Sequence, residues 1–323
     1  MLLKKVLAVV IFAFLLIGEL NSGLTAEDLA KYGIATLPTP VLHTPDFPDV
    51  FGGKDGSTLR LDEDNQIKGL EFIALPKTVF KIKKIINKDG RIIYRVTTKD
   101  YPYPTNKGYF IDSRFVKMVK TKPPERPKIL PSKQTIIQNL LAAKGSNYLR
   151  GGNYKDGVPQ IPSFYRLSSS ISLRVQDKWM LKGVDCSGLL YQATNGYTPR
   201  NTSSLVSYGA PVRIAGLKVD QIIKKVEPLD IIVGRGHVVV ILNKEQVIES
   251  CLHCDKYKKG LQAGVRIRRL KEVLAEIMEK RIPVDSYEDK VEEGEKKFVI
   301  RRWYEQIKFL PFLLGTPSST CSF

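Results

Sequence analysis

Two segments of this chain supply a nucleophile and a base. Cys186 stands in a Gly-Val-Asp-Cys-Ser-Gly segment, and His237 opens a His-Val-Val-Val-Ile run further along the chain. A cysteine attacks as its thiolate, which the first turn of a helix stabilises through unpaired N–H groups and the helix dipole. The apolar residues 189–193 predict a helix that begins at Cys186. The β-branched residues 238–241 predict a buried strand with His237 at its edge. These residue types permit nucleophilic catalysis by a cysteine with a histidine as its base.

Composition indicates a folded chain with a basic surface. The 323 residues, 43% of them hydrophobic, are enough for two domains. Lys plus Arg number 51 and Asp plus Glu 33, so the net charge is +18. This excess predicts a polyanionic partner or surface, such as an anionic envelope polymer or a lipid headgroup. Nucleic acid is not expected, because no Gly-rich phosphate loop, zinc-finger spacing or aromatic RNA-binding signature accompanies the charge.

The first 26 residues predict export. Lys4 and Lys5 precede an uninterrupted apolar run at 6–17, and small and polar residues follow, as in a secretory signal peptide cleaved near Ser22 or after Ala26. The run is too short to span a bilayer comfortably. An uncleaved signal segment is the alternative, and it is the only membrane attachment that we expect. The predicted location is therefore secreted or periplasmic.

Three further segments have the composition of connections. Residues 27–50 are rich in Pro and Thr and predict an extended arm, with His43 exposed to solvent. The prolines and charges of residues 121–132 predict an extended, solvated linker. Residues 311–323 form a tail to which no role is assigned.

Residues 51–120 carry the signals of a small all-β domain. Strand-like runs alternate with tight turns, and the Asp89-Gly90 pair predicts a hairpin. Short strands without a convincing helix favour a small β-barrel. Residues 108–117, in which an aromatic pair precedes a Ser and a terminal hydrophobic-Lys pair, resemble the closing strand and turn of bacterial SH3-like domains. The alternative is a β-rich extension with no separate role.

Residues 133–310 predict a second domain of a different class. Residues 133–144 have apolar positions at helical spacing, with Ser132 as the N-cap. A Gly151-Gly152 turn, the cysteine helix and a series of strands follow in that order. Such an order predicts an α+β domain in which a helix packs on an antiparallel sheet.

Six blocks of this second domain resemble, in the same order, those of the NlpC-type cell-wall cysteine peptidases. They are Tyr148-Leu149-Arg150-Gly151-Gly152, Asp185-Cys186-Ser187-Gly188, Thr198-Pro199-Arg200-Asn201-Thr202-Ser203, Glu227-Pro228-Leu229-Asp230-Ile231, His237-Val238-Val239 and Val247-Ile248-Glu249. Six ordered blocks are a more specific signal than one short motif. The resemblance covers about residues 133–310 and implies a papain-like fold. An SH3-like domain before the peptidase domain is a familiar arrangement in that family.

The resemblance implies a role for three residues in catalysis. Cys186 would be the nucleophile, and His237 the base that takes its proton and returns it to the leaving amine. The position of the third residue, often a histidine in relatives, is occupied here by Glu249. A carboxylate can orient the imidazole and stabilise the imidazolium, so this departure concerns substrate or pH optimum more than activity. Neither a metal nor a cofactor is expected.

Four more residues are candidates for substrate binding by the same resemblance. Asp185 and Ser187 would help to form the pocket, and the Tyr148 hydroxyl would donate to the oxyanion beside the N–H of Cys186. Arg200 matches a recurrent arginine of the family, for which a purely structural role is the alternative. Each has a plainer alternative, since an Asp before a helix is often an N-cap and a Tyr beside a Gly-Gly pair is often part of the core.

The segment 153–185 is longer than the corresponding part of many relatives. A long loop beside an active site is often a lid or a specificity element. If it is a lid, deletion of residues 161–176 is expected to change substrate choice or the Michaelis constant. The alternative is a surface insertion without a role in catalysis.

The Cys251-Leu-His-Cys254 segment leaves three alternatives open. It can form a disulfide in an oxidising envelope, provide half of a zinc site or hold unpaired thiols. A zinc site needs a fourth ligand, and only Cys321 remains as a sulfur donor. We therefore rank the disulfide and the free thiols above a metal. His253 competes with Glu249 as the residue that orients His237.

The function implied by the resemblance is that of a peptidoglycan hydrolase. Its cysteine endopeptidase domain would cleave an amide bond of the stem peptide, between γ-D-glutamate and the diamino acid, in intact wall or in released muropeptides. The SH3-like domain would bind wall or restrict cleavage to peptides with a free N-terminal L-alanine. Two alternatives stay open: a lipid or other acyltransferase on the same papain-like scaffold, and a non-catalytic wall-binding protein.

Overall fold

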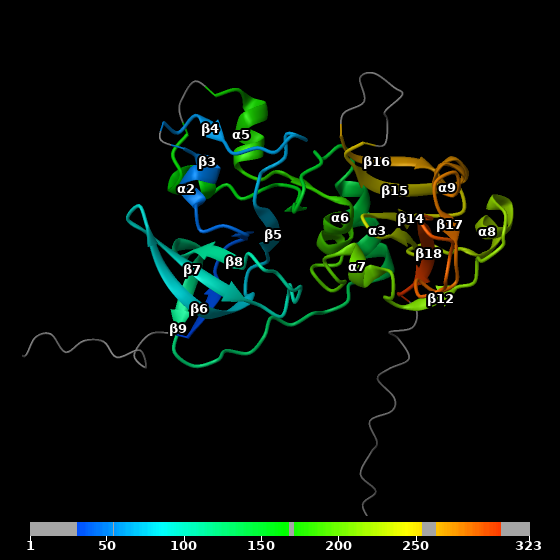
Figure 1. The fold of residues 1–323 in the computed structure, drawn as a ribbon, viewed down its shortest axis with the longest axis horizontal. Helices are drawn as coiled ribbons and strands as arrows, with labels where there is room; N and C mark the ends of the chain where they lie inside the picture. Colours follow the sequence, from blue (N-terminus) through cyan, green and yellow to red (C-terminus); the bar gives the residue numbers. More distant parts are fainter. Residues whose placement is uncertain (1–30, 54, 168–170, 254–262, 305–323) are drawn as a thin grey trace, which may run out of the picture.

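The structure is a computed structural model that describes residues 31–304 except 54, 168–170 and 254–262 (Figure 1). The expected signal segment, residues 1–26, and the tail, residues 311–323, lie outside the described residues. Within the described part of the chain, no helix combines the length and hydrophobicity needed to cross a membrane. The chain has a mixed α/β architecture, with one large antiparallel sheet in each of two parts.

The N-terminal part is built on a seven-stranded antiparallel sheet in the order β5-β2-β8-β7-β6-β1-β9. The strands are β1 (Tyr32–Ala35), β2 (Thr39–Leu42), β5 (Leu70–Ala74), β6 (Val79–Lys88), β7 (Arg91–Thr97), β8 (Tyr109–Asp112) and β9 (Val116–Val119). The short elements α2 (Phe47–Val50), β3 (Phe51–Gly52), β4 (Thr58–Leu59) and the 3₁₀ turn η1 (Ser113–Phe115) complete this part. Asp89 and Gly90 both have positive φ between β6 and β7, which confirms the predicted hairpin. The SH3-like barrel stays an expectation.

The extended arm predicted for residues 27–50 is wrong for its described part. β1 pairs with β6 and β9, and β2 pairs with β5 and β8, so both strands belong to the sheet. The prolines made this segment look extended and irregular, although it contains two strands of four residues each. Val41 and Leu42 of β2 are fully buried. His43, predicted to be exposed, is only 25% exposed, and its Nδ1 lies 2.8 Å from Oε1 of Glu71.

The C-terminal part has a second antiparallel sheet, in the order β12-β18-β13-β14-β15-β16, with the short β17 parallel to β18. The strands are β12 (Ala210–Val212), β13 (Ile231–Gly234), β14 (His237–Ile241), β15 (Gln246–Cys251), β16 (Gly264–Arg269), β17 (Ile282–Pro283) and β18 (Lys297–Arg302). The helices are α3 (Lys133–Ala142), α6 (Cys186–Ala193), α7 (Thr202–Leu205), α8 (Val219–Lys225) and α9 (Leu270–Met278). The predicted α+β arrangement of helix and antiparallel sheet is present.

Both faces of this second sheet are covered by helices. The core on one face joins α3 and α6 to strand residues such as Val240 and Ile248. The core on the other face joins α8 and α9 to strand residues such as Val239 and Val247. Alternate residues of β14 and β15 therefore enter opposite cores, which fixes the register of the strands that carry His237 and Glu249.

The segment 153–185 packs against the N-terminal part. It contains β10 (Asn153–Tyr154), α4 (Ile161–Phe164), α5 (Leu173–Trp179) and β11 (Gly183–Val184), and α5 lies beside β3 and β4 in Figure 1. Tyr165 and Trp179 share a core with Phe47 and Phe51. Tyr165 also donates its hydroxyl hydrogen to the buried carboxylate of Asp112. The segment therefore joins the two parts of the molecule through a hydrophobic core.

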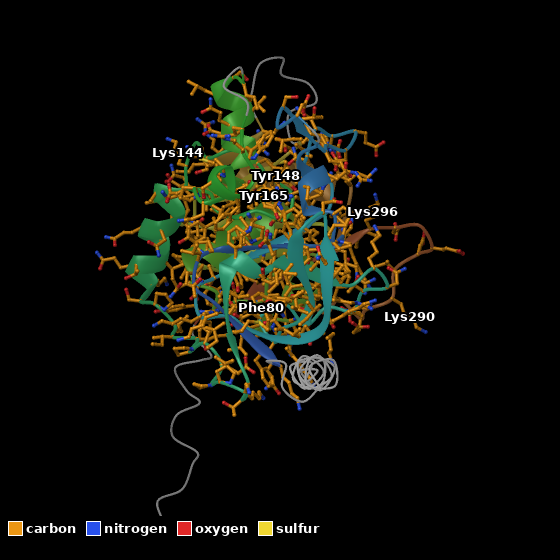
Figure 2. All side chains as sticks on the ribbon, turned by 90° about the vertical axis from the view of Figure 1, so that its left-hand side faces the viewer. Phe80, Lys144, Tyr148, Tyr165, Lys290 and Lys296 are labelled. Carbon is orange, nitrogen blue, oxygen red and sulfur yellow. The ribbon has the colours of Figure 1, made fainter. Side chains whose placement is uncertain are left out.

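The predicted linker, residues 121–132, has no regular secondary structure, yet it is not solvated throughout. Arg126 is 9% exposed and donates to Asp100 of the N-terminal part and to the carbonyls of Asn195 and Gly196 of the C-terminal part. Exposed basic residues include Lys144, Lys290 and Lys296, which lie at the edge of the molecule in Figure 2. The linker thus fixes the two parts to one another at one buried point.

Candidate active site

Cys186 is the first residue of helix α6, as the sequence predicted. The side chain of Asp185 caps the helix by accepting the N–H of Gly188 at 2.7 Å. The Cys186 side chain is nearly buried, and its Sγ lies 3.9 Å from the carbonyl oxygen of Gly236. The thiol therefore sits where unpaired helix N–H groups favour negative charge, beside the residue that precedes His237.

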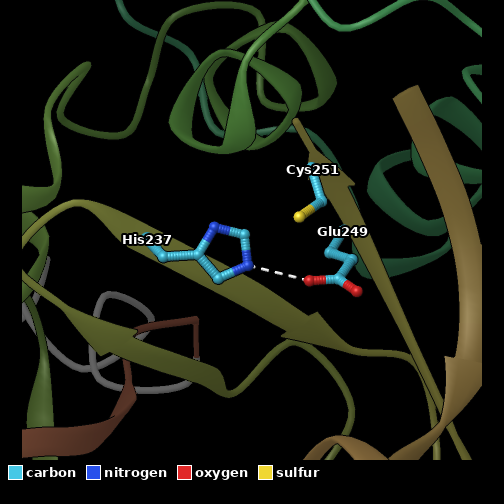
Figure 3. Close-up of side chains that lie close together, drawn as sticks. All are labelled: His237, Glu249 and Cys251. Atoms are coloured by element: carbon cyan, nitrogen blue, oxygen red, sulfur yellow. Dashed lines mark hydrogen bonds and ion pairs between the residues drawn. The ribbon is translucent and has the colours of Figure 1, made fainter. Parts of the chain in front are cut away.

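His237 and Glu249 come together from neighbouring strands. His237 opens β14 and Glu249 lies on β15, and Nε2 of the imidazole donates to Oε2 of the carboxylate at 2.8 Å (Figure 3). The Glu249 side chain is 2% exposed, whereas that of His237 is 31% exposed. Cys186 is the other hydrogen-bond partner of the imidazole. Since Nε2 faces Glu249, Nδ1 is the ring nitrogen left to face the thiol.

His237 and Glu249 shift each other's pKa. Burial lowers the pKa of His237, but hydrogen bonds to Cys186 and Glu249 outweigh burial and raise the pKa to about 10. Burial likewise raises the pKa of Glu249, but His237 and two nearby arginines outweigh it and lower the pKa below its ordinary value. An ionised Glu249 that holds a protonated His237 is the arrangement that stabilises an imidazolium beside a thiolate.

The two arginines beside Glu249 were not singled out from the sequence. Nε of Arg266 and Nη1 of Arg268 each lie 3.4 Å from Oε1 of Glu249, opposite the oxygen that His237 contacts. Arg266 is the cross-strand partner of Glu249 in the β15–β16 pair. The sequence does indicate that Arg266 and Arg268 lie on the same face of a strand, because residues two apart on a strand share a face. To place these arginines beside Glu249 also requires the register between β15 and β16, which the sequence does not supply.

Asp185, Ser187 and Arg200 form one buried network. The Arg200 side chain is 1% exposed, and it donates to Asp185 Oδ2 at 2.7 Å and to Ser187 Oγ at 2.9 Å. It also donates to Asn153 Oδ1 and to the Gly152 carbonyl. The guanidinium is thus occupied by internal partners, which favours the structural alternative for Arg200. Substrate contact by Asp185 and Ser187 stays a prediction, since both side chains are buried in this network.

Tyr148 lies next to the same network. Burial and the nearby charges of Asp185 and Cys186 raise its pKa, so its hydroxyl keeps its proton at physiological pH. The phenol is therefore a permanent hydrogen-bond donor near Cys186. This property suits the predicted contact with an oxyanion, which stays a prediction.

Three side chains near the site have the atom types that bind metal ions. A ring nitrogen of His237, a carboxylate oxygen of Glu249 and Sγ of Cys251 lie within 4.8 Å of one another (Figure 3). Cys251 is disulfide-bonded, so its sulfur is not the thiolate that a metal requires. Arg266 and Arg268 also place positive charge against Glu249. The donor set therefore does not fit a divalent cation.

The structure decides among the alternatives left open for the Cys251 region. The disulfide is confirmed at Cys251, whereas Cys254 and Cys321 lie outside the described residues. His253 does not compete for the imidazole, because its Nε2 lies 3.2 Å from Oδ1 of Asp64 instead. Glu249 is consequently the residue that orients His237.

Comparisons with known proteins leave the family of this chain open. No family model and no curated protein matches it. Five solved chains match, among them an NlpC/P60 family protein from Bacillus cereus ATCC 10987, at 14% identity and a TM-score of 0.29 over 88% of this chain and 66% of that one. Another is RipD from Mycobacterium tuberculosis, described as a non-catalytic NlpC/p60 domain protein adapted to peptidoglycan binding, at 15% identity and a TM-score of 0.28 over 53% of this chain and 95% of that one. Likenesses of this size leave the question of function to the geometry of the site.

Proposed function

We propose that this chain is a peptidoglycan hydrolase that acts as a cysteine endopeptidase on the stem peptide. The observation that carries the proposal is that His237 interacts with Cys186 on one side and with Glu249 on the other. The cysteine lies at a helix N-terminus, and the carboxylate is buried. The bond to be cleaved is the amide between γ-D-glutamate and the diamino acid, as the sequence resemblance implies. The site of action is the cell envelope, in a secreted or periplasmic protein.

The reaction proceeds by acyl transfer. The Cys186 thiolate attacks the amide carbonyl, and the oxyanion receives hydrogen bonds from the N–H of Cys186 and the hydroxyl of Tyr148. The His237 imidazolium then gives its proton to the departing amine, which leaves a thioester on Cys186. His237 next takes a proton from water, which hydrolyses the thioester. Glu249 keeps the imidazole in one orientation through both steps.

A carboxylate of the N-terminal part supports recognition of a free amine. Glu71 Oε2 accepts a hydrogen bond from the hydroxyl of Tyr101 at 3.3 Å. The same hydroxyl accepts a hydrogen bond from Nδ2 of Asn201 at 3.3 Å. Asn201 follows Arg200, which holds the residue before the nucleophile. Glu71 Oε1 also lies 2.8 Å from Nδ1 of His43, and the side chain is 26% exposed, so a ligand amine would reach this carboxylate at the exposed edge of its pair with His43. We assign selection for a free N-terminal L-alanine to this carboxylate.

Two other functions use the same fold and remain distinguishable. An acyltransferase would turn over phospholipid without turning over muropeptides, and the basic surface would dock on anionic headgroups. A non-catalytic wall-binding protein would retain its effects when Cys186 is replaced. The complete set of catalytic groups in hydrogen-bonding order favours the hydrolase.

The test is mass spectrometry of defined muropeptides after incubation with the wild-type protein or with Cys186→Ala. Each peptide is supplied with a free and with a blocked L-alanine terminus, across a range of pH. Cleavage at the γ-D-glutamyl bond that is absent in Cys186→Ala supports the proposal. No cleavage by the wild-type protein under any of these conditions would overturn it.

A further inference from the structure

The position of His237 defines where the leaving half of the substrate must lie. The imidazole protonates the departing amine, so the diamino acid that carries this amine contacts the residues around His237. Gly234 pairs with His237 at the end of the β13–β14 hairpin, which leaves Arg235 and Gly236 as its two-residue turn. The turn also lies beside Cys186, whose Sγ is 3.9 Å from the carbonyl oxygen of Gly236.

Arg235 is the charged residue of this turn, it is exposed, and its backbone is held on both sides. Its N–H donates to the Tyr287 hydroxyl at 3.1 Å, and its carbonyl accepts Nη2 of Arg281 at 3.4 Å. The guanidinium carbon lies 5.6 Å from the centroid of the Tyr287 ring. Stacking on an aromatic ring orients the planar guanidinium while its N–H donors stay available.

A second cation, Lys297, lies over the same ring, and Arg281 contacts the backbone of both cations. The ammonium of Lys297 lies 5.2 Å from the Tyr287 centroid, and Nη1 of Arg281 donates to the carbonyl of Lys297. Within the described ranges, none of Arg235, Arg281 and Lys297 forms an ion pair with a carboxylate. Glu288 and Asp289 adjoin Tyr287 in sequence, yet neither pairs with Arg235. Lys297 donates to the carbonyl of Asp289 and Arg281 donates to two backbone carbonyls, so Arg235 is the cation of this group whose guanidinium can receive an anion, with two further positive charges beside it.

We propose that Arg235, supported by Arg281, binds a carboxylate of the amino acid on the leaving side of the scissile bond. The guanidinium offers the paired N–H donors that match a carboxylate in two parallel hydrogen bonds. This inference rests on the proposed function, because His237 must protonate the leaving amine for the turn to face the diamino acid. It assigns selection of a free acid over its amide to one exposed residue.

The experiment compares two tripeptides, L-alanyl-γ-D-glutamyl-diamino acid as the free acid and as the amide of its diamino acid carboxylates. The wild-type protein is expected to favour the free acid in kcat/KM, mainly through KM. For Arg235→Gln, kcat/KM is expected to fall about tenfold with the free acid and to change little with the amide. A loss of this size corresponds to one charge-assisted interaction. Arg235→Lys should restore part of the preference. Arg269→Gln is the matched control, because this exposed arginine pairs with Glu272 instead.

Binding provides a readout that does not depend on catalysis. Titration of both peptides into Cys186→Ala, and into Cys186→Ala combined with Arg235→Gln, should show a preference for the acid only in the first protein. Equal affinity or equal kcat/KM for acid and amide in the protein with Arg235 would overturn the anion site and leave the hydrolase proposal intact. Hydrolysis of neither peptide, with preferential binding of the acid retained, would count against the hydrolase alone.

Discussion

Nε2 of His237 donates to Oε2 of Glu249 across 2.8 Å, and the carboxylate that receives this hydrogen bond is 2% exposed. The pair is strong because little water competes for it and because Arg266 and Arg268 balance the charge of Glu249 from the other side. The carboxylate does more than orient the ring, since it also favours the protonated imidazole.

Glu249→Gln is expected to lower the pKa of His237, because the carboxylate is one of the groups that raise it to about 10. The alkaline limb of kcat/KM, which reports the loss of the imidazolium, should therefore move to lower pH. We expect kcat to fall about ten- to a hundredfold, since each 1.36 kcal/mol of lost transition-state stabilisation costs about tenfold. The measurement is a pH–rate profile with muropeptide substrate. An unchanged alkaline limb would contradict this role, and Glu272→Gln, which removes an exposed carboxylate paired with Arg269, is the control.

The same pair predicts a pH window for stability. The folded pKa of His237 is about 10, above its ordinary 6.5, so its contribution is complete below about pH 6.5 and is lost as pH rises towards 10. The folded pKa of Glu249 lies below its ordinary 4.5, so its contribution is present above pH 4.5 and is lost in acid. Urea unfolding of wild type and His237→Gln should differ most between pH 4.5 and 6.5. A difference that grows from pH 7 to pH 10 would contradict the sign of the His237 shift.

The sequence predicted the helix at Cys186 and the strand at His237 because their signals are local. The helix that begins at Cys186 and the strand that begins at His237 each follow from adjacent residues. Arg266 and Arg268 could not be assigned, because their relation to Glu249 depends on strand register between distant segments. The strands at 32–35 and 39–42 were missed for a related reason, since four residues among prolines show no periodicity and are held by partners far along the chain.

Arg200→Met is expected to reduce the free energy of unfolding by about 3–5 kcal/mol, because it leaves the Asp185 carboxylate buried without its cation. Ser187 and the Gly152 carbonyl would lose the same partner. The measurement is urea unfolding at neutral pH, with Arg269→Gln as a control for the loss of an exposed arginine. A change below about 1 kcal/mol, the range of surface ion pairs, would show that the network is not structural.

Gly188→Ala tests the close approach of helix α6 to the Gly152 backbone. A Cβ at residue 188 would lie 2.0 Å from the Gly152 oxygen, so α6 must shift and carry Cys186 with it. The gain in helix propensity, about 1 kcal/mol, does not offset a clash with backbone. We expect kcat to fall at least tenfold in protein that remains folded by circular dichroism. Gly33→Ala is the control, since its Cβ would meet Val116 at 3.4 Å, and wild-type kinetics for Gly188→Ala would refute the constraint.

The segment 153–185 was expected to be either a lid or a surface insertion, and its packing predicts a third behaviour. Trp179 is fully buried, and its Nε1 donates to the Tyr165 carbonyl at 3.2 Å within the core shared with Phe47 and Phe51. Trp179→Ala should therefore reduce the free energy of unfolding by about 3–5 kcal/mol. Leu173→Ala, at a side chain that is 78% exposed, should change it by less than about 0.5 kcal/mol. A lid that moves freely would give the opposite pattern, with KM altered in Trp179→Ala and stability retained, because a mobile segment contributes little to the folded core.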